Sequence, residues 1–316
     1  LPAGCAVAVA ESVSEQQASS PTVVVLGLGL IGGSLAAALR GNGFCRRCIG
    51  WGHREASLQR GVELGIIDSY PLDLEAAVDA ADILVIATPT LVAAQMLERI
   101  LPRLQGRAQP PVITDVASVK GNLQSTAEAV WGGMPPRLVL GHPIAGSERS
   151  GVDAADAGLF LHHRVILTPV PGNDASAVEL VRAMWASTGA EVVDMAVAEH
   201  DRVLAATSHL PHVLAYALVD ALARSDASAD IFRFAAGGFR DFTRIASSDP
   251  VMWRDIAIAN RPALLQAIDL FSDHLQELRA AIDEQQSDAL LETFSRAKDA
   301  RDAFAAELAA RGQRPA

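Results

Sequence analysis

His142 is the residue whose type and surroundings best suit acid–base chemistry in this chain of 316 residues. It lies between Gly141 and Pro143, and the proline restricts the backbone and so fixes the direction of the side chain. A histidine can accept a proton near neutral pH, as the oxidation of an alcohol requires. A hydrogen-bonded structural histidine is the alternative, and the neighbouring motifs decide between the two in favour of a general base.

A glycine-rich segment at residues 23–34, VVVLGLGLIGGS, is typical of a turn that binds a dinucleotide. Four apolar residues predict a buried strand, and an Ala/Leu-rich helix follows at Leu35–Leu39. Gly27 allows the tight turn, Gly29 lets the backbone approach a pyrophosphate, and Gly32 lets helix and strand pack closely. The free N–H groups and the positive end of the helix dipole then hold the phosphates, which favours this interpretation over a purely steric turn. The residues predicted to bind cofactor here are Gly27, Leu28, Gly29, Leu30, Ile31 and Gly32.

Three polar segments each follow a predicted strand: Thr88-Pro89, residues 115–120 (DVASVK) and residues 141–148 (GHPIAGSE). Ligands of open α/β sheets bind outside the carboxyl ends of the strands, so we expect these segments to lie together. The sequence therefore predicts that Thr88 and Pro89 lie at the cofactor.

Ser118 lies close enough in this topology to bond either His142 or a substrate hydroxyl. Alternatively, it caps the helix predicted at Val119–Ala129. Lys120 is expected to pair with Asp115.

A second histidine-bearing segment, HDRVLAATSHLPH, spans residues 200–212. His209 and His212 are three residues apart and hence lie on one face of a helix. Pro211 removes an N–H and predicts a kink, which suits a helix bent around a pocket. The pair lacks both the glutamate of a zinc-binding HExxH motif and a third ligand, so we predict no metal site.

Residues 237–246, GGFRDFTRIA, bring two arginines into one short segment. A planar guanidinium binds a carboxylate through two hydrogen bonds, so Arg240 and Arg244 are candidates for that task. One of the two is expected to form a structural pair with Asp241 or Asp249.

Short apolar segments alternate with helical ones through the first two thirds of the chain and must position these groups. This alternation predicts a Rossmann-type doubly wound parallel sheet of the α/β class. The strands are predicted at residues 48–51, 82–88, 112–116, 138–141, 164–168 and 191–194, and helices at residues 55–64, 91–101 and 175–188.

From about Met195, apolar residues recur at helical spacing and no strand is predicted. We therefore expect a disordered tail at residues 1–20, a dinucleotide-binding domain at 21–194, and an all-helical domain at 195–316. Such a helical domain could close over the cofactor and pair with a second copy.

The composition excludes several other classes of function. A net charge of −11 argues against nucleic acid or an anionic membrane surface as partner. The longest apolar run, residues 23–39, carries four glycines and is shorter than the ~20 residues that span a bilayer. Residues 1–20 contain no Lys or Arg, unlike a secretory signal, and three cysteines suit reduced thiols. We expect a cytoplasmic protein.

Taken together, these motifs resemble the prephenate/arogenate (cyclohexadienyl) dehydrogenase family of tyrosine biosynthesis. The resemblance runs from about residue 21 to residue 278 and rests on GLGLIGGS, TDVASVKG, GHPIAGSERSG, HDRVLAATSHLPH and GFRDFTRIASSDPVMW. It implies oxidative decarboxylation of prephenate to 4-hydroxyphenylpyruvate, or of arogenate to tyrosine, with NAD or NADP. It also implies a Rossmann-type domain followed by a helical dimerisation domain, and hence a homodimer.

The resemblance also implies roles for single residues. His142 polarises the ring 4-hydroxyl and takes its proton, with Ser118 alongside. His212 lies near the substrate side chain, and Arg244 binds a substrate carboxylate. We further expect His209 and Glu148 to line the substrate site. Since the sequence leaves no room for a separate regulatory domain, we expect tyrosine to inhibit at the active site.

The choice of cofactor stays open because the sequence departs from the pattern of NAD-preferring members. Those members carry an acidic residue at the end of the second strand, which bonds the ribose hydroxyls. Here His53 lies near that position, and with Arg54 it could accept a 2′-phosphate instead. Glu55 is the alternative, as an acid displaced by a residue or two.

Two other functions are compatible with part of the pattern. Another two-domain reductase, such as a β-hydroxyacid dehydrogenase, relies on a catalytic lysine where this chain has HDRVLAATSHLPH. A non-catalytic dinucleotide sensor would not call for His142, Ser118 and Arg244 together, and turnover of prephenate separates it from an enzyme.

Overall fold

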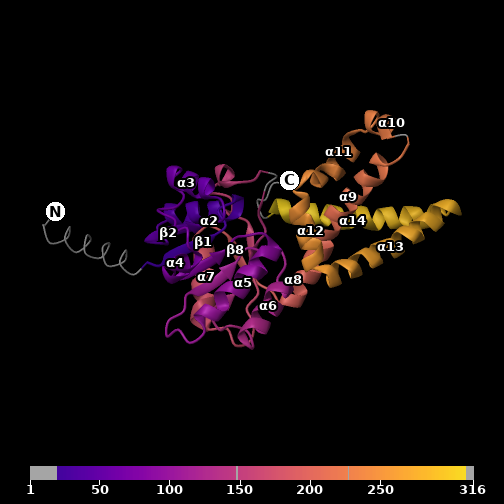
Figure 1. The fold of residues 1–316 in the computed structure, drawn as a ribbon. Coiled ribbons are helices and arrows are strands. Elements are labelled where there is room, and N and C mark those ends of the chain that lie inside the picture. The colour runs from indigo at the N-terminus through magenta and orange to yellow at the C-terminus, as the bar shows by residue number, and fades with distance from the viewer. Residues whose placement is uncertain (1–19, 147–148, 227, 311–316) are drawn as a thin grey trace, which may run out of the picture. The chain divides into compact units, whose positions relative to one another are not determined.

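The computed structural model describes residues 20–146, 149–226 and 228–310 of the chain. The chain divides into two compact units after Arg261. The first unit contains all the described strands, and the second consists of helix (Figure 1).

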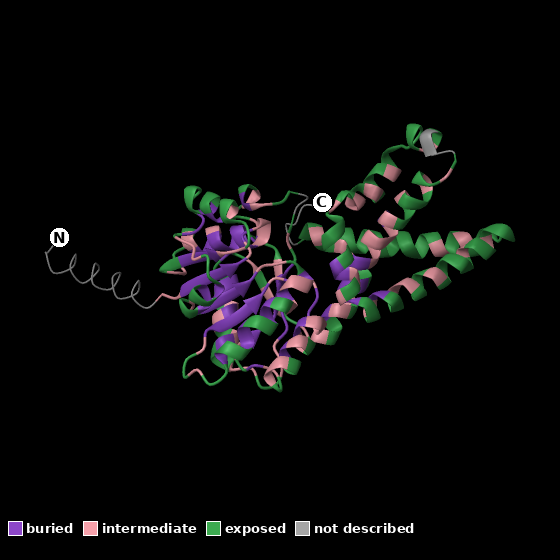
Figure 2. Ribbon diagram, in the orientation of Figure 1, coloured by how far each residue is buried: buried purple, intermediate pink, exposed green. Residues whose placement is uncertain are grey.

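A parallel five-stranded sheet with the order β2-β1-β3-β4-β5 forms the core of the first unit. Its strands are buried on both faces (Figure 2), as their almost continuously apolar sequences predict. The order reverses between β1 and β3, and a crevice at such a point is where open sheets of this kind bind ligands. The strands are β1 Thr22–Leu26, β2 Arg47–Trp51, β3 Ile83–Ile86, β4 Val112–Asp115 and β5 Leu138–Val139.

Helices cover both faces of this sheet. Val23 and Val25 belong to one apolar cluster with residues of α2 and α7, whereas Val24 and Leu26 belong to another with residues of α5 and α6. Alternate residues of one strand therefore pack on opposite sides, and the doubly wound α/β fold predicted from the sequence is confirmed. The helices are α2 Leu30–Gly41, α3 Glu55–Glu63, α4 Leu74–Asp79, α5 Thr90–Leu104, α6 Gly121–Trp131 and α7 Ala175–Ala186.

The three later strands form a second sheet, β6 Gly141–Pro143, β7 Arg164–Leu167 and β8 Glu191–Asp194, in which β6 and β7 are antiparallel. The prediction of one strand over residues 138–141 was wrong, because β5 ends at Val139 and the chain changes sheet there. The backbone of Gly141 is bound by side chains instead: its N–H donates to Asp115 Oδ1 (3.1 Å) and its carbonyl accepts from Lys120 Nζ (2.6 Å). Those groups are therefore not available to extend the ladder with β4.

After β8 every described element is helical, as the sequence predicts. Within the first unit these elements are α8 Val197–Leu204, a π-helical turn η2 Ala205–His209, α9 Leu210–Ala223, α10 Ser228–Arg233, α11 Gly237–Thr243, a 3₁₀ turn η3 Arg244–Ser247 and α12 Pro250–Ala259. A short 3₁₀ turn, η1 Val152–Ala154, precedes β7. The domain boundary near residue 194 stays a prediction.

The second unit contains α14 Ser287–Ala310 and all but the first residue of α13 Arg261–Asp283. Most residues of both helices are exposed (Figure 2). Several of these residues have large apolar side chains. They include Leu270, Phe271, Leu275, Ile282, Leu291, Phe294 and Phe304. Among the described helices, none combines the length and the hydropathy that crossing a membrane requires.

Candidate active site

The turn after β1 places three glycines in positions that suit the roles predicted for them. Gly27 has a φ of +103°, and a Cβ there would lie 2.6 Å from the carbonyl oxygen of Ala87. A Cβ on Gly32 would lie 2.1 Å from the carbonyl oxygen of Gly27, so only glycine lets α2 pack this closely. Apart from the adjacent residues and the backbone of its own helix, no described residue comes within 4 Å of the Cβ position of Gly29, which leaves the backbone there open to a ligand.

The start of α2 fits a phosphate group. Its N-cap residue, Gly29, offers no capping side chain, and the first turn contains no acidic residue. The first N–H groups of a helix have no partner within it and lie at the positive end of its dipole. Leu28 is buried, while Leu30 and Ile31 are half-buried beside this turn. The residues present therefore fit the pyrophosphate of a dinucleotide.

The ends of β2 and β3 flank this turn. Thr88 follows β3, and its hydroxyl oxygen is buried without a partner among the described residues, while Pro89 is exposed. His53 and Arg54 follow β2 and are exposed, and Arg54 is the N-cap residue of α3, whose first turn carries Glu55. His53, Arg54 and Glu55 thus all lie directly after the carboxyl end of β2.

A buried ion pair holds the end of β4 against β6. Lys120 is 0% exposed, and its Nζ donates to Asp115 Oδ2 and to the carbonyl of Gly141. Burial lowers the pKa of Lys120, and the Asp115 carboxylate opposes that effect. The predicted pairing of Lys120 with Asp115 is confirmed, and it fixes the backbone one residue before His142.

His142 lies on β6 at the end of a chain of hydrogen bonds that the sequence reading missed. Its Nδ1 lies 2.9 Å from Nε2 of His200, and Nδ1 of His200 lies 2.8 Å from Oδ1 of Asp201. His142 is 9% exposed and His200 is 0% exposed. The adjacent His200 and Asp201 open the segment 200–212, so the signal was present, but nothing local ties them to β6.

This chain of bonds determines which ring nitrogens carry protons. A carboxylate only accepts, so Nδ1 of His200 donates to Asp201 and Nε2 of His200 is left as an acceptor. His142 must then donate from Nδ1, and its Nε2 carries the free lone pair. The arrangement thus makes Nε2 of His142 a base.

Burial is the main cause that holds the pKa of His142 well below its usual value of 6.5. The positive charge of Lys120 and the rings of His200 and His209 act in the same direction. His142 is therefore neutral and able to accept a proton at neutral pH.

Ser118 does not cap a helix. Helix α6 begins at Gly121 rather than Val119, and the side chain of Asp201 accepts hydrogen bonds from the N–H groups of Lys120 (2.9 Å) and Gly121 (2.8 Å). The alternative role of Ser118 as the helix cap was therefore wrong. The described hydrogen bond of His142 is to His200, and Ser118 is half-buried on the loop after β4.

A π-helical turn at residues 205–209 precedes Pro211, which occupies the first turn of α9. A π turn is where a helix absorbs the register change that a missing N–H imposes. His209 ends this turn and is 1% exposed, whereas His212 lies in α9 and is half-buried. The two side chains come from adjoining helical segments, and both rings contact Trp253 of α12.

His209 presents a buried donor. Nδ2 of Asn260 donates one hydrogen to the backbone carbonyl of Asp201 (2.8 Å). Because an amide nitrogen carries two hydrogens and only donates, it also donates to Nδ1 of His209 at 3.1 Å. The proton of neutral His209 therefore lies on Nε2, which is buried with no partner among the described residues. Burial lowers the pKa of His209 from 6.5 to about 4. A buried donor of this kind requires an acceptor, and a bound ligand or water would supply one.

His212 stacks on Trp253 of α12, with ring centroids 3.5 Å apart and an interplanar angle of 18°. Its Nδ1 donates to the carbonyl of Ser208 (3.0 Å), which leaves Nε2 as an acceptor. Burial first, and then the positive charge of Arg244, lowers the pKa of His212. Trp253, whose Nε1 is also buried without a described partner, and Asn260 were both missed from the sequence because they lie far along the chain.

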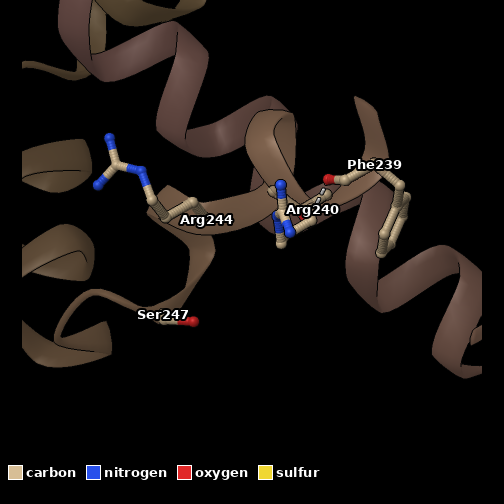
Figure 3. Close-up of a pocket in the computed structure, with 5 residues that line it drawn as sticks. Phe239, Arg240, Arg244 and Ser247 are labelled. Carbon is tan, nitrogen blue, oxygen red and sulfur yellow. Dashed lines mark hydrogen bonds between the residues drawn. The ribbon is translucent and has the colours of Figure 1, made fainter. Parts of the chain in front are cut away.

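Arg244 lines a pocket of about 520 Å³ together with Phe239, Arg240, Thr243 and Ser247. In Figure 3 the Arg244 side chain extends away from Arg240 and Phe239. Arg240 pairs with Asp241 (3.1 Å) at the surface, which confirms that one arginine of the segment forms such a pair. Asp249 instead accepts from N–H groups at the start of α12. Glu148, the remaining predicted substrate ligand, lies outside the described residues.

Comparison with known proteins covers most of the chain. Residues 35–194 match the family described as "Prephenate dehydrogenase, nucleotide-binding domain", and residues 196–296 match "Prephenate dehydrogenase, dimerization domain". A prephenate dehydrogenase of Bacillus subtilis is 38% identical over 284 residues, which are 89% of this chain and 75% of that protein. A cyclohexadienyl dehydrogenase of Zymomonas mobilis is 36% identical, over 88% of this chain and 94% of that protein.

A solved structure is similar over nearly the same range. The crystal structure of prephenate dehydrogenase from A. aeolicus, in complex with hydroxyphenyl propionate and NAD+, superposes with a TM-score of 0.83. It is 35% identical in sequence and covers 90% of this chain and 99% of that one. The similarity therefore includes both the sheet with its glycine-rich turn and the helices that follow it.

Proposed function

The chain belongs to the prephenate dehydrogenase family, and we propose that it converts prephenate to 4-hydroxyphenylpyruvate by NAD(P)-dependent oxidative decarboxylation, in tyrosine biosynthesis. The observation that carries this function is a buried, neutral His142 with a free Nε2 lone pair. It lies in the chain after the five-stranded sheet, tied by Gly141 to the carboxyl end of β4. Family membership also decides against the β-hydroxyacid dehydrogenases.

His142 takes the proton of the ring 4-hydroxyl on Nε2 as the ring carbon is oxidised. Bound NAD(P)+ supplies the acceptor for the hydride that leaves this carbon. The forming ketone is conjugated through the ring to the carbon that bears the carboxylate. Loss of CO₂ sends the electron pair of the broken C–C bond into the ring, which becomes aromatic, and the ring oxygen regains a proton. One positioned base is therefore enough, and no metal is required.

The two substrate carboxylates call for cationic or donor groups. We assign Arg244 to a carboxylate, because its guanidinium lines the pocket beside α11 and acts electrostatically on His212. His209 offers a buried Nε2–H donor, and His212 an acceptor near the substrate side chain. Ser118 is assigned to the ring hydroxyl beside His142, and Glu148 keeps its predicted role in binding substrate.

Prephenate and arogenate differ in the side chain, which ends in a keto acid or an amino acid. A relative named cyclohexadienyl dehydrogenase is among the similar proteins, and we infer that this chain accepts prephenate first and arogenate as a further substrate. Tyrosine, which resembles the product, is proposed to inhibit by binding in the same pocket. A cytoplasmic location stays a prediction as well.

We infer a homodimer built on the helical region. The matched family describes residues 196–296 as a dimerization domain, and α13 and α14 expose large apolar side chains along their length. Large apolar side chains exposed along two helices are typical of an interface between subunits. Light scattering of the purified protein would give twice the mass of one chain if this is so.

Steady-state kinetics tests the function directly. Prephenate and arogenate are each supplied with NAD+ and with NADP+, and reduced cofactor is followed by absorbance. Turnover of prephenate with CO₂ release supports the proposal. Binding of the cofactor without turnover of either substrate would instead support a dinucleotide sensor.

A further inference from the structure

We propose that His200 and Asp201, called the His200–Asp201 pair below, position His142 as its Nδ1–H tautomer and share the proton that it takes from substrate. The proposal rests on the proposed function and names two further residues for the same reaction. Both are positioning residues, because they act through His142 rather than by touching substrate.

The first step of the argument is the direction of the hydrogen bonds. Oδ1 of Asp201, Nδ1 of His200, Nε2 of His200 and Nδ1 of His142 form a continuous series, with separations of 2.8 Å and 2.9 Å between residues. Only one assignment of protons satisfies both bonds while all groups keep their ordinary charge, and it leaves Nε2 of His142 unprotonated. Without the pair, neither tautomer of His142 would be favoured by a described hydrogen bond.

The second step concerns charge. The groups that face His142 are the cation Lys120 with its partner Asp115, His200 with its partner Asp201, and His209. Lys120 and the two histidines all disfavour a positive charge on His142, and burial does so most strongly. Among the described residues no carboxylate bonds His142 itself. A proton held on its ring alone would therefore be poorly stabilised.

The third step is the balance of the proton transfer. When Nε2 of His142 gains the substrate proton, Nδ1 can pass its own proton over 2.9 Å to Nε2 of His200. His200 then becomes an imidazolium whose Nδ1–H faces the Asp201 carboxylate at 2.8 Å. Asp201 acts in the direction that favours this charge. When CO₂ leaves and the ring oxygen regains a proton, the same transfers run backwards, so no proton has to be released to solvent.

The fourth step is the rigidity of Asp201. Its carboxylate also accepts from the N–H groups of Lys120 and Gly121, so the start of α6 holds it in place. A Cβ on Gly121 would lie 2.7 Å from Oδ2 of Asp201, so the close approach depends on glycine. The orientation of His142 is thus linked to the first turn of a helix that follows β4.

Asp201→Asn and His200→Gln test the pair. Asp201→Asn removes the negative charge. Its amide NH2 is a donor, whereas the groups around Asp201 in the wild type are themselves donors that bond to a carboxylate oxygen. His200→Gln keeps both helix-capping bonds of Asp201 and an acceptor for Nδ1 of His142, yet it cannot take a proton. We expect kcat for prephenate to fall by about ten- to a thousandfold in each, with the dissociation constant of NAD+ unchanged.

Two readouts would not move if the pair were merely structural. Burial lowers the pKa of His200, and Asp201 opposes that effect. Loss of the Asp201 charge should therefore shift the acid limb of kcat/KM to lower pH while the plateau falls. The ¹⁵N NMR signals of His142 in the resting protein should report an unprotonated Nε2 in the wild type and a mixture of tautomers in Asp201→Asn. This second readout needs no substrate, so it remains informative even if prephenate is not turned over.

Gly121→Ala provides an independent test, because its methyl group displaces Asp201 without altering any polar group. We expect kcat to fall, whereas Gly41→Ala serves as the matched control. Gly41 ends α2, and outside its own helix and adjacent residues no described residue comes within 4 Å of its Cβ position, so its variant should keep the wild-type rate.

The proposal is overturned if His200→Gln folds and shows the wild-type kcat, acid limb and ¹⁵N signals. If Asp201→Asn does not fold, His200→Gln decides alone, since it leaves the helix cap intact. A loss of kcat in Gly121→Ala equal to that in Gly41→Ala would likewise contradict the linkage to α6.

Discussion

The glycine-rich turn after β1 and the histidine chain around His142 hold their functional groups in different ways. The turn presents backbone N–H groups, and everything it needs lies within one strand, one turn and the start of one helix. The histidine chain joins side chains of β6 and α8, and backbone N–H groups at the start of α6, up to 81 residues away, hold its Asp201. A cofactor site of the first kind tolerates other side chains as long as the room around its backbone is kept. A proton-accepting site of the second kind depends on the identity of each side chain.

His142→Asn should produce the largest effect, because it removes the base itself. We expect kcat to fall by about 10²–10⁴-fold while the affinity for NAD+ is retained, since a positioned general base contributes about that much. Stopped-flow detection of reduced cofactor and a fluorescence titration with NAD+ measure the two quantities. A variant with the wild-type rate would rule out the role of His142.

Arg244→Ala should come next, with an increase in KM for prephenate of roughly 10–150-fold and little change in KM for the cofactor. The lost charge-assisted contact to a carboxylate is worth about 1.5–3 kcal/mol. Arg240→Ala is the matched control, since Arg240 lines the same pocket and pairs at the surface with Asp241. A larger KM effect in Arg240→Ala would mean that the substrate arginine is wrongly assigned.

Gly29→Ala and Gly32→Ala should have different effects, because Gly29 leaves room for a ligand and Gly32 leaves room for the packing of α2. Open space surrounds Gly29, so its variant should keep its thermal stability and lose affinity for NAD+. The methyl group of Gly32→Ala would meet the carbonyl of Gly27, so this variant should lose about 1–3 kcal/mol of stability. Calorimetry and a cofactor titration on both variants give the comparison, and an equal loss of stability in the two would contradict it.

The free energy of unfolding should decrease as the pH is lowered, because His209 becomes protonated. Its pKa is about 4 in the folded chain and about 6.5 unfolded, so the unfolded state binds more protons between these values. The contribution is fully present above pH 6.5 and is lost as the pH falls toward 4, by up to about 3 kcal/mol. Urea unfolding at both ends of this range measures it. His209→Gln keeps an acceptor for Asn260 and should show a smaller loss, and an equal loss would exclude His209 as its source.

Arg54→Ala should have the smallest effect, confined to NADP+. If Arg54 binds the 2′-phosphate, its loss lowers kcat/KM for NADP+ by about tenfold and leaves that for NAD+ unchanged. An unchanged efficiency with NADP+ would mean that Arg54 does not contact the phosphate. A strong preference of the wild type for NAD+ would point to Glu55 as the ribose ligand.

The features that the sequence could predict are the local ones, like the glycine-rich turn, and those it could not predict depend on tertiary contacts, like the histidine chain. The turn at residues 27–32 and the alternation of strands and helices are local patterns, so the α/β fold and the glycine positions were predictable. The change of sheet after Val139 was not, because it depends on Asp115 and Lys120 binding the backbone of Gly141. Asp201 was not identified for the same reason, since capping α6 and bonding His200 are tertiary contacts that no local spacing reveals.

The pH dependence of kcat/KM for prephenate in the wild-type protein tests the central claim most directly, that a buried neutral His142 is the base. Because burial and the neighbouring positive charge of Lys120 hold its pKa well below 6.5, the rate should stay level as the pH falls from about 8 through 6.5, and should decline only at lower pH. A decline of the rate centred at or above pH 6.5 would contradict this claim. The claim also requires an acid limb in the wild type that His142→Asn abolishes, and it is contradicted if no such limb exists.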